Sequence, residues 1–167
     1  MTTYKDHALA FLSSRVSPEG LRGRADTWRQ KSLAVDGLDV PAVLDRAAGH
    51  IEAMTDALAK VAELIEGMED ASSVGSAIQS LPIPDASIVD DIWAVGQALR
   101  EDNRDPHGGS TASHLEMAAD ELRHLSSEAV QLRTMALEDL NRIRNAAFGA
   151  VGRLVTEPSH EAPALRM

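Results

Sequence analysis

The stretch DVPAVLDRAAGHIEAMTDALAKVAELIEGM, residues 39–68, decides the fold class. Asp39 can cap a helix, and Pro41 falls in its first turn, where proline is tolerated. Apolar residues then follow at alternating steps of three and four: Leu44, Ala47, Ile51, Met54, Leu58, Val61, Ile65 and Met68. This repeat predicts a long helix, over about residues 39–70, with either a coiled-coil seam or one face of an intramolecular bundle.

A second long helix is predicted over about residues 112–156. Ser113-x-x-Glu116 matches a capping box at its start, and Pro158 ends it. Its first apolar positions keep the heptad spacing: Leu115, Ala118, Leu122, Leu125, Ala129, Leu132 and Ala136. Its later positions are closer to an eleven-residue period: Leu140, Ile143, Ala147, Val151 and Leu154. Such a change relaxes a left-handed supercoil.

Shorter elements fill the rest of the chain. We expect an amphipathic helix over 3–15, a helix that begins after Ser17 and ends near Val35, and a helix around residues 88–99. The segment 71–87 is small, polar and proline-containing, which predicts a linker with about one helical turn. Loop signals at Asp105-Pro106 and Gly108-Gly109 place a loop at 101–112.

These elements predict an all-α protein, an elongated antiparallel bundle in which helices 39–70 and 112–156 pair. Its predicted segments are a basic N-terminal helical segment, a bundle and a C-terminal tail, at residues 1–35, 36–157 and 158–167.

Composition narrows the function classes. No run approaches 18 apolar residues, so we expect no membrane span. Cysteine is absent, which excludes disulfides, thiolate metal sites and cysteine nucleophiles. We expect a cytoplasmic protein, or a virion protein if it is phage-encoded. Arginine outnumbers lysine thirteen to three, which is typical of a GC-rich bacterial or phage genome.

The net charge of -10 is unevenly distributed. Residues 1–31 carry six bases and three acids, whereas residues 32–99 carry twelve acids against Arg46 and Lys60. The acidic middle disfavours nucleic acid as a partner. The basic segment could be a DNA-binding headpiece bearing Arg22, Arg24 and Arg29. We prefer the alternative that it folds on the acidic middle of its own or a neighbouring chain.

The stretch HLEMAADELRH, residues 114–124, raises the question of a metal site. Helical bundles that bind two metals use pairs of Glu-x-x-His motifs, and Glu121-x-x-His124 supplies one. At 100° per residue, Glu121 lies about 60° and His124 about 120° from Ala118, and His114 lies two turns before Glu121, about 10 Å along the axis. The three side chains therefore do not converge on one ion. We therefore predict no metal and no cofactor, unless a neighbouring chain completes a site.

Two stretches of the chain have features of signalling proteins. His50 lies in the middle of a helix, as phosphotransfer histidines do, and Asp26-x-x-x-Gln30 has the spacing of helical phosphatases that act on response regulators. No Gly-x-Ser-x-Gly elbow or phosphate-binding glycine loop is present, so the sequence indicates neither nucleophilic catalysis nor a small-molecule substrate.

The sequence therefore predicts a non-enzymatic oligomeric interaction protein, a structural or adaptor component of a bacterial or phage assembly. We expect it to bind itself and another protein. Alternatives are a helical module acting on response regulators and a DNA-binding regulator. The predicted interaction residues are the two seams: Leu44, Ile51, Leu58, Ile65, Leu122, Leu132, Leu140 and Ile143.

Overall fold

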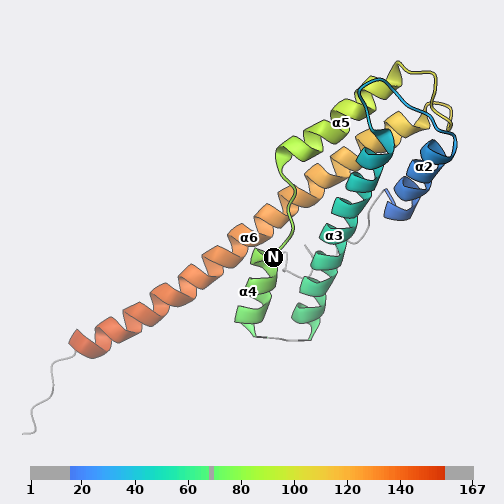
Figure 1. The fold of residues 1–167 in the computed structure, drawn as a ribbon. Helices are drawn as coiled ribbons and strands as arrows, with labels where there is room; N and C mark the ends of the chain where they lie inside the picture. Colours follow the sequence, from blue (N-terminus) through green and yellow to red (C-terminus); the bar gives the residue numbers. More distant parts are fainter. Residues whose placement is uncertain (1–15, 68–69, 157–167) are drawn as a thin grey trace, which may run out of the picture. The chain divides into compact units, whose positions relative to one another are not determined.

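The computed structural model describes residues 16–67 and 70–156 and is built from helices (Figure 1). They are α2 (Pro18–Gln30), α3 (Val40–Glu66), α4 (Ala71–Gln79), α5 (Ala86–Arg100) and α6 (Ser110–Thr156). Within those residues no strand forms, and the all-α prediction is confirmed. The helix predicted over 3–15 and the tail 158–167 lie outside the described residues.

Local capping starts α2 and α3 where the sequence predicts. The Ser17 hydroxyl accepts a hydrogen bond from the Gly20 backbone N–H at 3.0 Å, and Pro18 follows in the first turn. Asp39 accepts from the Ala42 N–H at 3.1 Å. Each bond satisfies a donor that the first helical turn leaves without a partner. α2 ends at Gln30, earlier than the predicted end near Val35.

The predicted linker 71–87 contains the helix α4 in place of about one turn, so that part of the prediction is wrong. Asp70 caps α4 by accepting from the Ser73 N–H at 2.8 Å and from the Ser73 hydroxyl at 3.1 Å. At the other end of α4, Arg133 of α6 donates to the carbonyls of Ile78, Gln79 and Leu81. A local cap and a distant arginine stabilise a segment whose composition alone indicates a linker.

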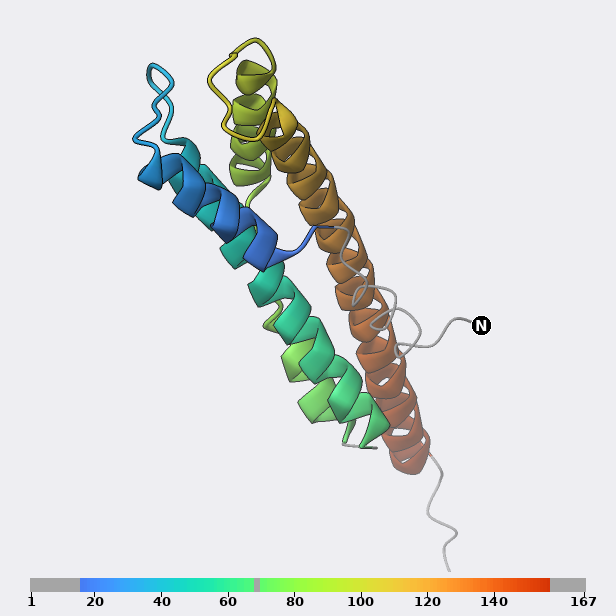
Figure 2. The same cartoon turned by 90° about the vertical axis from the view of Figure 1, so that its right-hand side faces the viewer.

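The chain divides into two units between Arg133 and Thr134, and α6 spans the division. In the first unit α2 and α3 run antiparallel. Arg22, in the first half of α2, contacts Glu52, whereas Arg29, in the last turn of α2, contacts Asp45. Rising numbers on α2 therefore meet falling numbers on α3, as Figures 1 and 2 show.

Contacts made by α2 also give the direction of α6. Trp28 of α2 contacts Thr111, and Arg24 contacts His114, so α2 is antiparallel to the start of α6 as well. It follows that α3 and the 110–133 part of α6 run in the same direction, which corrects the predicted antiparallel pairing of these two helices. The reason is that the chain reverses twice between them: α4 and α5 carry it back before α6 begins (Figure 1).

Buried residues of α2, α3, α5 and the start of α6 form one hydrophobic core. Five of the predicted seam residues have 0% exposure in the unit: Leu44, Ile51, Leu58, Leu122 and Leu132. Ile65 is half-buried. The heptad stripes are therefore faces of an intramolecular bundle, the second of the two arrangements that the spacing allowed.

The described part of the second unit is the segment 134–156 of α6. Leu137 is 50% exposed, and Asn145 and Ala147 are exposed too. The side chains of Leu140 and Ile143, the last two predicted interaction residues, lie outside the described part. Over both units, none of the described helices is sufficiently long and apolar to cross a membrane.

Candidate functional site

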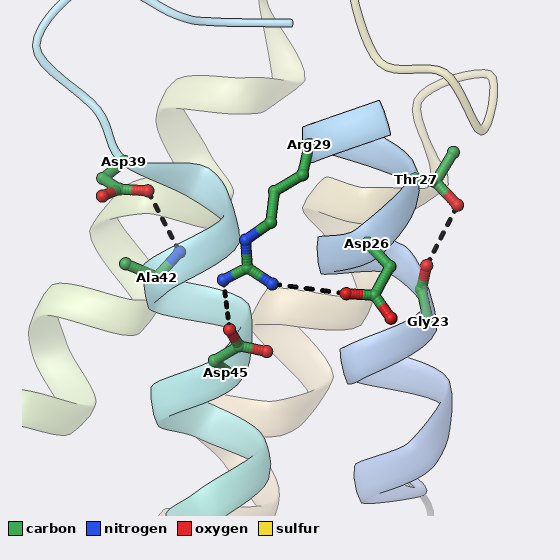
Figure 3. A network of polar contacts seen from close by, with 7 residues as sticks. All are labelled: Gly23, Asp26, Thr27, Arg29, Asp39, Ala42 and Asp45. Atoms are coloured by element: carbon green, nitrogen blue, oxygen red, sulfur yellow. Dashed lines mark hydrogen bonds and ion pairs between the residues drawn. The ribbon is translucent and has the colours of Figure 1, made fainter. Parts of the chain in front are cut away.

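A charged face joins α2 to α3 (Figure 3). Arg29 of α2 lies between two carboxylates, with Asp45 of α3 on one side and Asp26 of its own helix, at 3.4 Å, on the other. Two helical turns of α3 further along, the guanidinium of Arg22 binds both oxygens of Glu52, at 3.2 and 2.5 Å. The hydrogen bond from Arg22 holds the pKa of Glu52 below its ordinary value.

These pairs use the basic charge of α2 inside the chain. Arg22 and Arg29, two of the three arginines considered for a DNA-binding headpiece, bind acids of α3, and the third, Arg24, contacts the start of α6. This is the arrangement expected of a basic segment that folds on the acidic middle of its own chain. A phosphate backbone would have to compete with those carboxylates for both guanidinium groups.

A second polar cluster joins α5 to α6. Glu116 is only 7% exposed, and its carboxylate accepts from Gln97 at 2.6 Å and from two nitrogens of Arg100. The predicted capping box is therefore wrong: Ser113 lies inside α6, and Glu116 turns to α5. Burying a carboxylate is tolerated here because a bidentate arginine and an amide satisfy it.

The true cap of α6 is Asp105, from the preceding loop. One of its oxygens accepts from the Thr111 backbone N–H at 2.7 Å, and the other from the Thr111 hydroxyl at 2.7 Å and from the His107 N–H at 2.9 Å. Burial alone raises the pKa of Asp105, but these hydrogen bonds outweigh it and hold the pKa below its ordinary value. The six-residue separation between Asp105 and Thr111 is not a capping spacing, so only the Asp-Pro turn signalled this loop.

The residues of HLEMAADELRH are divided among different surroundings. His114 contacts Arg24 and the Ser110 carbonyl, Glu121 is 8% exposed, and His124 is exposed. Across residues 16–67 and 70–156, no three His, Cys, Asp or Glu side chains come together as a metal site requires. The stretch begins the buried face of α6, as its apolar spacing predicts.

The two signalling motifs occupy ordinary helix positions. His50 is half-buried on α3. Asp26 pairs with Arg29, and Gln30 is exposed at the last turn of α2. A phosphatase that orients water through this pair would need Asp26 released from its arginine.

Sequence reasoning missed a buried link between α2 and α6. Trp28 has 0% exposure, and its indole N–H points to the Thr111 hydroxyl at 3.4 Å. The sequence placed Trp28 in a basic segment, and its own helix gives no indication of a partner so far along the chain. The sequence did hold one signal. Trp28, one of only two tryptophans in the chain, lies on the same face of its helix as Leu21 and Ala25, and so large an apolar side chain on an apolar face indicates a core residue.

The described polar clusters thus share one property, because each joins two elements of the first unit. These contacts fix the positions of the helices relative to one another within the first unit. In comparisons with protein-family models, curated proteins and solved structures, the chain matched nothing.

Proposed function

We propose that this chain is a non-enzymatic oligomeric component of a bacterial or phage assembly, a structural or adaptor subunit, and that it associates through residues 134–156 of α6. The observation that carries the proposal is the continuation of α6 to Thr156 past the end of the first unit at Arg133. Helices in water owe most of their stability to packing of an amphipathic face. A helical segment of this length favours a partner along its side.

The sequence of this segment supplies a face for such a partner. Leu140, Ile143, Ala147, Val151 and Leu154 fall within about 80° of one another at 100° per residue. Ala147 is exposed, as is Leu137 at the flank of this stripe. The eleven-residue spacing of the stripe suits a straight or slightly right-handed helix pair.

Burial in the first unit supports this division of roles. The predicted seam residues up to Leu132 that have 0% exposure already contact side chains of their own chain. Partner contacts through them would require the bundle to open.

Light scattering on the purified chain, coupled to size exclusion, tests the proposal. We expect a mass of at least twice the 17.9 kDa of one chain. Ala147→Glu places a charge on the stripe and should shift the chain toward the monomer. Asn145→Glu, about 200° around the same helix and also exposed, adds the same charge and should leave the mass unchanged. A wild-type monomer at every concentration, or equal effects of the two variants, contradicts the proposal.

A further inference from the structure

The apolar stripe at the end of α6 is symmetric about Ala147. The next stripe positions lie four residues away on either side, at Ile143 and Val151, and the following ones lie three residues further, at Leu140 and Leu154. The residue types match as well, because a β-branched residue stands on each side of the alanine and a leucine at each end. Two identical helices related by a two-fold axis need such a surface, since residue i contacts residue j and residue j contacts residue i.

A second copy of the chain could use this symmetry in either orientation. In an antiparallel pair centred on Ala147, each leucine lies opposite a leucine, Ile143 lies opposite Val151, and Ala147 lies opposite itself. In a parallel pair every position lies opposite itself. The small alanine at the centre allows the helix axes to approach to about 8–10 Å in both cases.

The buried part of α6 favours the antiparallel orientation. At 100° per residue, Leu132 lies about 60° and Ala136 about 20° from Ala147, so the stripe continues the face that is buried in the preceding turns. Leu132 is 0% and Ala136 6% exposed within their own chain. In a parallel pair the two α6 helices would have to separate within about two turns before Leu140, because Leu132 is already covered.

An antiparallel copy does not reach this covered face. In the register centred on Ala147, Thr156 of the second copy lies opposite position 138 of the first, and position 133 of the second copy lies opposite position 161. The overlap covers positions 138–156, about 28 Å of helix, and ends before Ala136. Each helix is thus paired only within the 134–156 segment of the other.

The charges beside the stripe also match those of a second copy. Asp139 lies about 80° and Arg153 about 120° from Ala147 in the same rotational sense, so both stand on one flank. A two-fold axis between antiparallel helices brings this flank of one copy to the same flank of the other. The register then places Asp139 roughly 3 Å along the axis from Arg153 of the second copy, and the contact occurs twice. Asp139 pairs with Arg142 of its own helix at 3.3 Å, and the second arginine would extend this pair into a network.

We propose that the stripe binds a second copy of this chain in antiparallel orientation, with the two-fold axis at Ala147. The pair then carries the first unit of one copy beyond one end of the overlap and that of the other copy beyond the other end. This inference rests on the proposed function, which places association in residues 134–156, and it adds the partner, the orientation and the register.

Disulfide formation between substituted chains tests the orientation. The chain has no cysteine, so each introduced thiol is the only one in its chain. A disulfide needs Cα atoms about 4.4–6.8 Å apart. After mild oxidation, an equimolar mixture of Ile143→Cys and Val151→Cys should give a covalent dimer that contains one chain of each. Either variant alone should form none, because its two thiols lie about 12 Å apart along the axis. Disulfides in each variant alone, with no mixed dimer, indicate a parallel pair and overturn the proposal.

Two further cysteine variants separate this proposal from the proposed function. Ala147→Cys lies at the symmetry axis in either orientation and should form a disulfide alone. Asn145→Cys, about 200° around the helix and exposed, should not. A disulfide in Ala147→Cys without a mixed dimer of the other two variants supports association through this segment but overturns the antiparallel pair. An absence of disulfides in all of these experiments overturns both.

Two charge reversals check the register without any thiol. In the antiparallel pair, Arg153→Glu places an acid beside Asp139 of the second copy, and the dissociation constant should rise about three- to tenfold. Arg144→Glu makes the same change of charge on the other flank, which would face Asp139 only in a parallel pair, so its effect should be smaller. Sedimentation equilibrium measures both constants. An equal or larger effect of Arg144→Glu overturns the proposed register.

Discussion

Gly96 marks a close approach of α5 to α6. A Cβ atom at this position would lie 3.0 Å from Cγ of Glu116, 3.1 Å from the carbonyl oxygen of Ala112 and 3.3 Å from the backbone nitrogen of Glu116. The side chain of Glu116 could move, but two of the three atoms belong to the α6 backbone. An alanine at position 96 therefore has to push the two helices apart.

Gly49 on α3 provides the matched control, because no atom lies within 4 Å of its added Cβ. Glycine to alanine within a helix gains about 1 kcal/mol of stability from backbone propensity alone. Gly49→Ala should realise that gain. Gly96→Ala gains the same amount but loses about 1–3 kcal/mol to overpacking, so it should be neutral or destabilised by up to about 2 kcal/mol. Because the propensity cancels, the difference between the variants measures the contact itself.

Urea unfolding followed by far-UV circular dichroism measures this difference. With a urea dependence of about 1–3 kcal/mol per molar, the two midpoints should separate by about 1 M, with Gly49→Ala above the wild type and Gly96→Ala at or below it. If Gly96→Ala stabilises the chain as much as Gly49→Ala does, α5 and α6 do not approach as described. The close packing of α5 on α6 at Gly96 would then be wrong.

Three further changes test other contacts of the first unit. Trp28→Ala should lower the free energy of unfolding by about 3–5 kcal/mol because it empties a fully buried site, and half-buried Trp93→Ala should cost clearly less in the same urea assay. Asp105→Ala leaves the Thr111 N–H without its acceptor and should cost about 1–3 kcal/mol at neutral pH. The pKa of Asp105 is lowered in the fold, so its contribution to the free energy of unfolding is present above the ordinary carboxyl pKa and is lost as the pH falls below it. The difference in free energy of unfolding between the variant and the wild type should therefore become smaller in acid. Arg133→Ala frees the carbonyls at the end of α4, and amide hydrogen exchange in α4 should become about five- to tenfold faster; unchanged exchange would show that this arginine does not hold the helix.

The parts of the fold that the sequence predicts correctly depend on contacts between near neighbours. Asp39 and Pro41 start α3 because the cap bond spans three residues, and the stripe of α3 is buried because its spacing places those side chains on one face. The start of α2 at Ser17 is right for the same reason.

The errors involve residues far apart in the chain. The Ser113-x-x-Glu116 spacing fits a capping box, but α6 already begins at Ser110, because Asp105 caps it from the loop. Glu116 is then free to satisfy Arg100. The direction of α3 relative to α6 depends on how many times the chain reverses between them. That number changes nothing in the spacing of either stripe, so periodicity could not determine it.

The change of period within α6 connects the fold to the proposed function. Its heptad positions run to Ala136, which is 6% exposed and the last buried side chain described on this helix. The division between the units falls beside it, after Arg133. A helix that keeps one partner has no reason to alter its repeat, since the repeat reflects the surface it packs against. The last heptad position, the last buried side chain described and the boundary between the units thus lie within a few residues of one another. The eleven-residue stripe beyond Ala136 is the part of the helix whose spacing would match a different partner, and the paired Ala147→Glu and Asn145→Glu variants address that stripe without touching the core of the first unit.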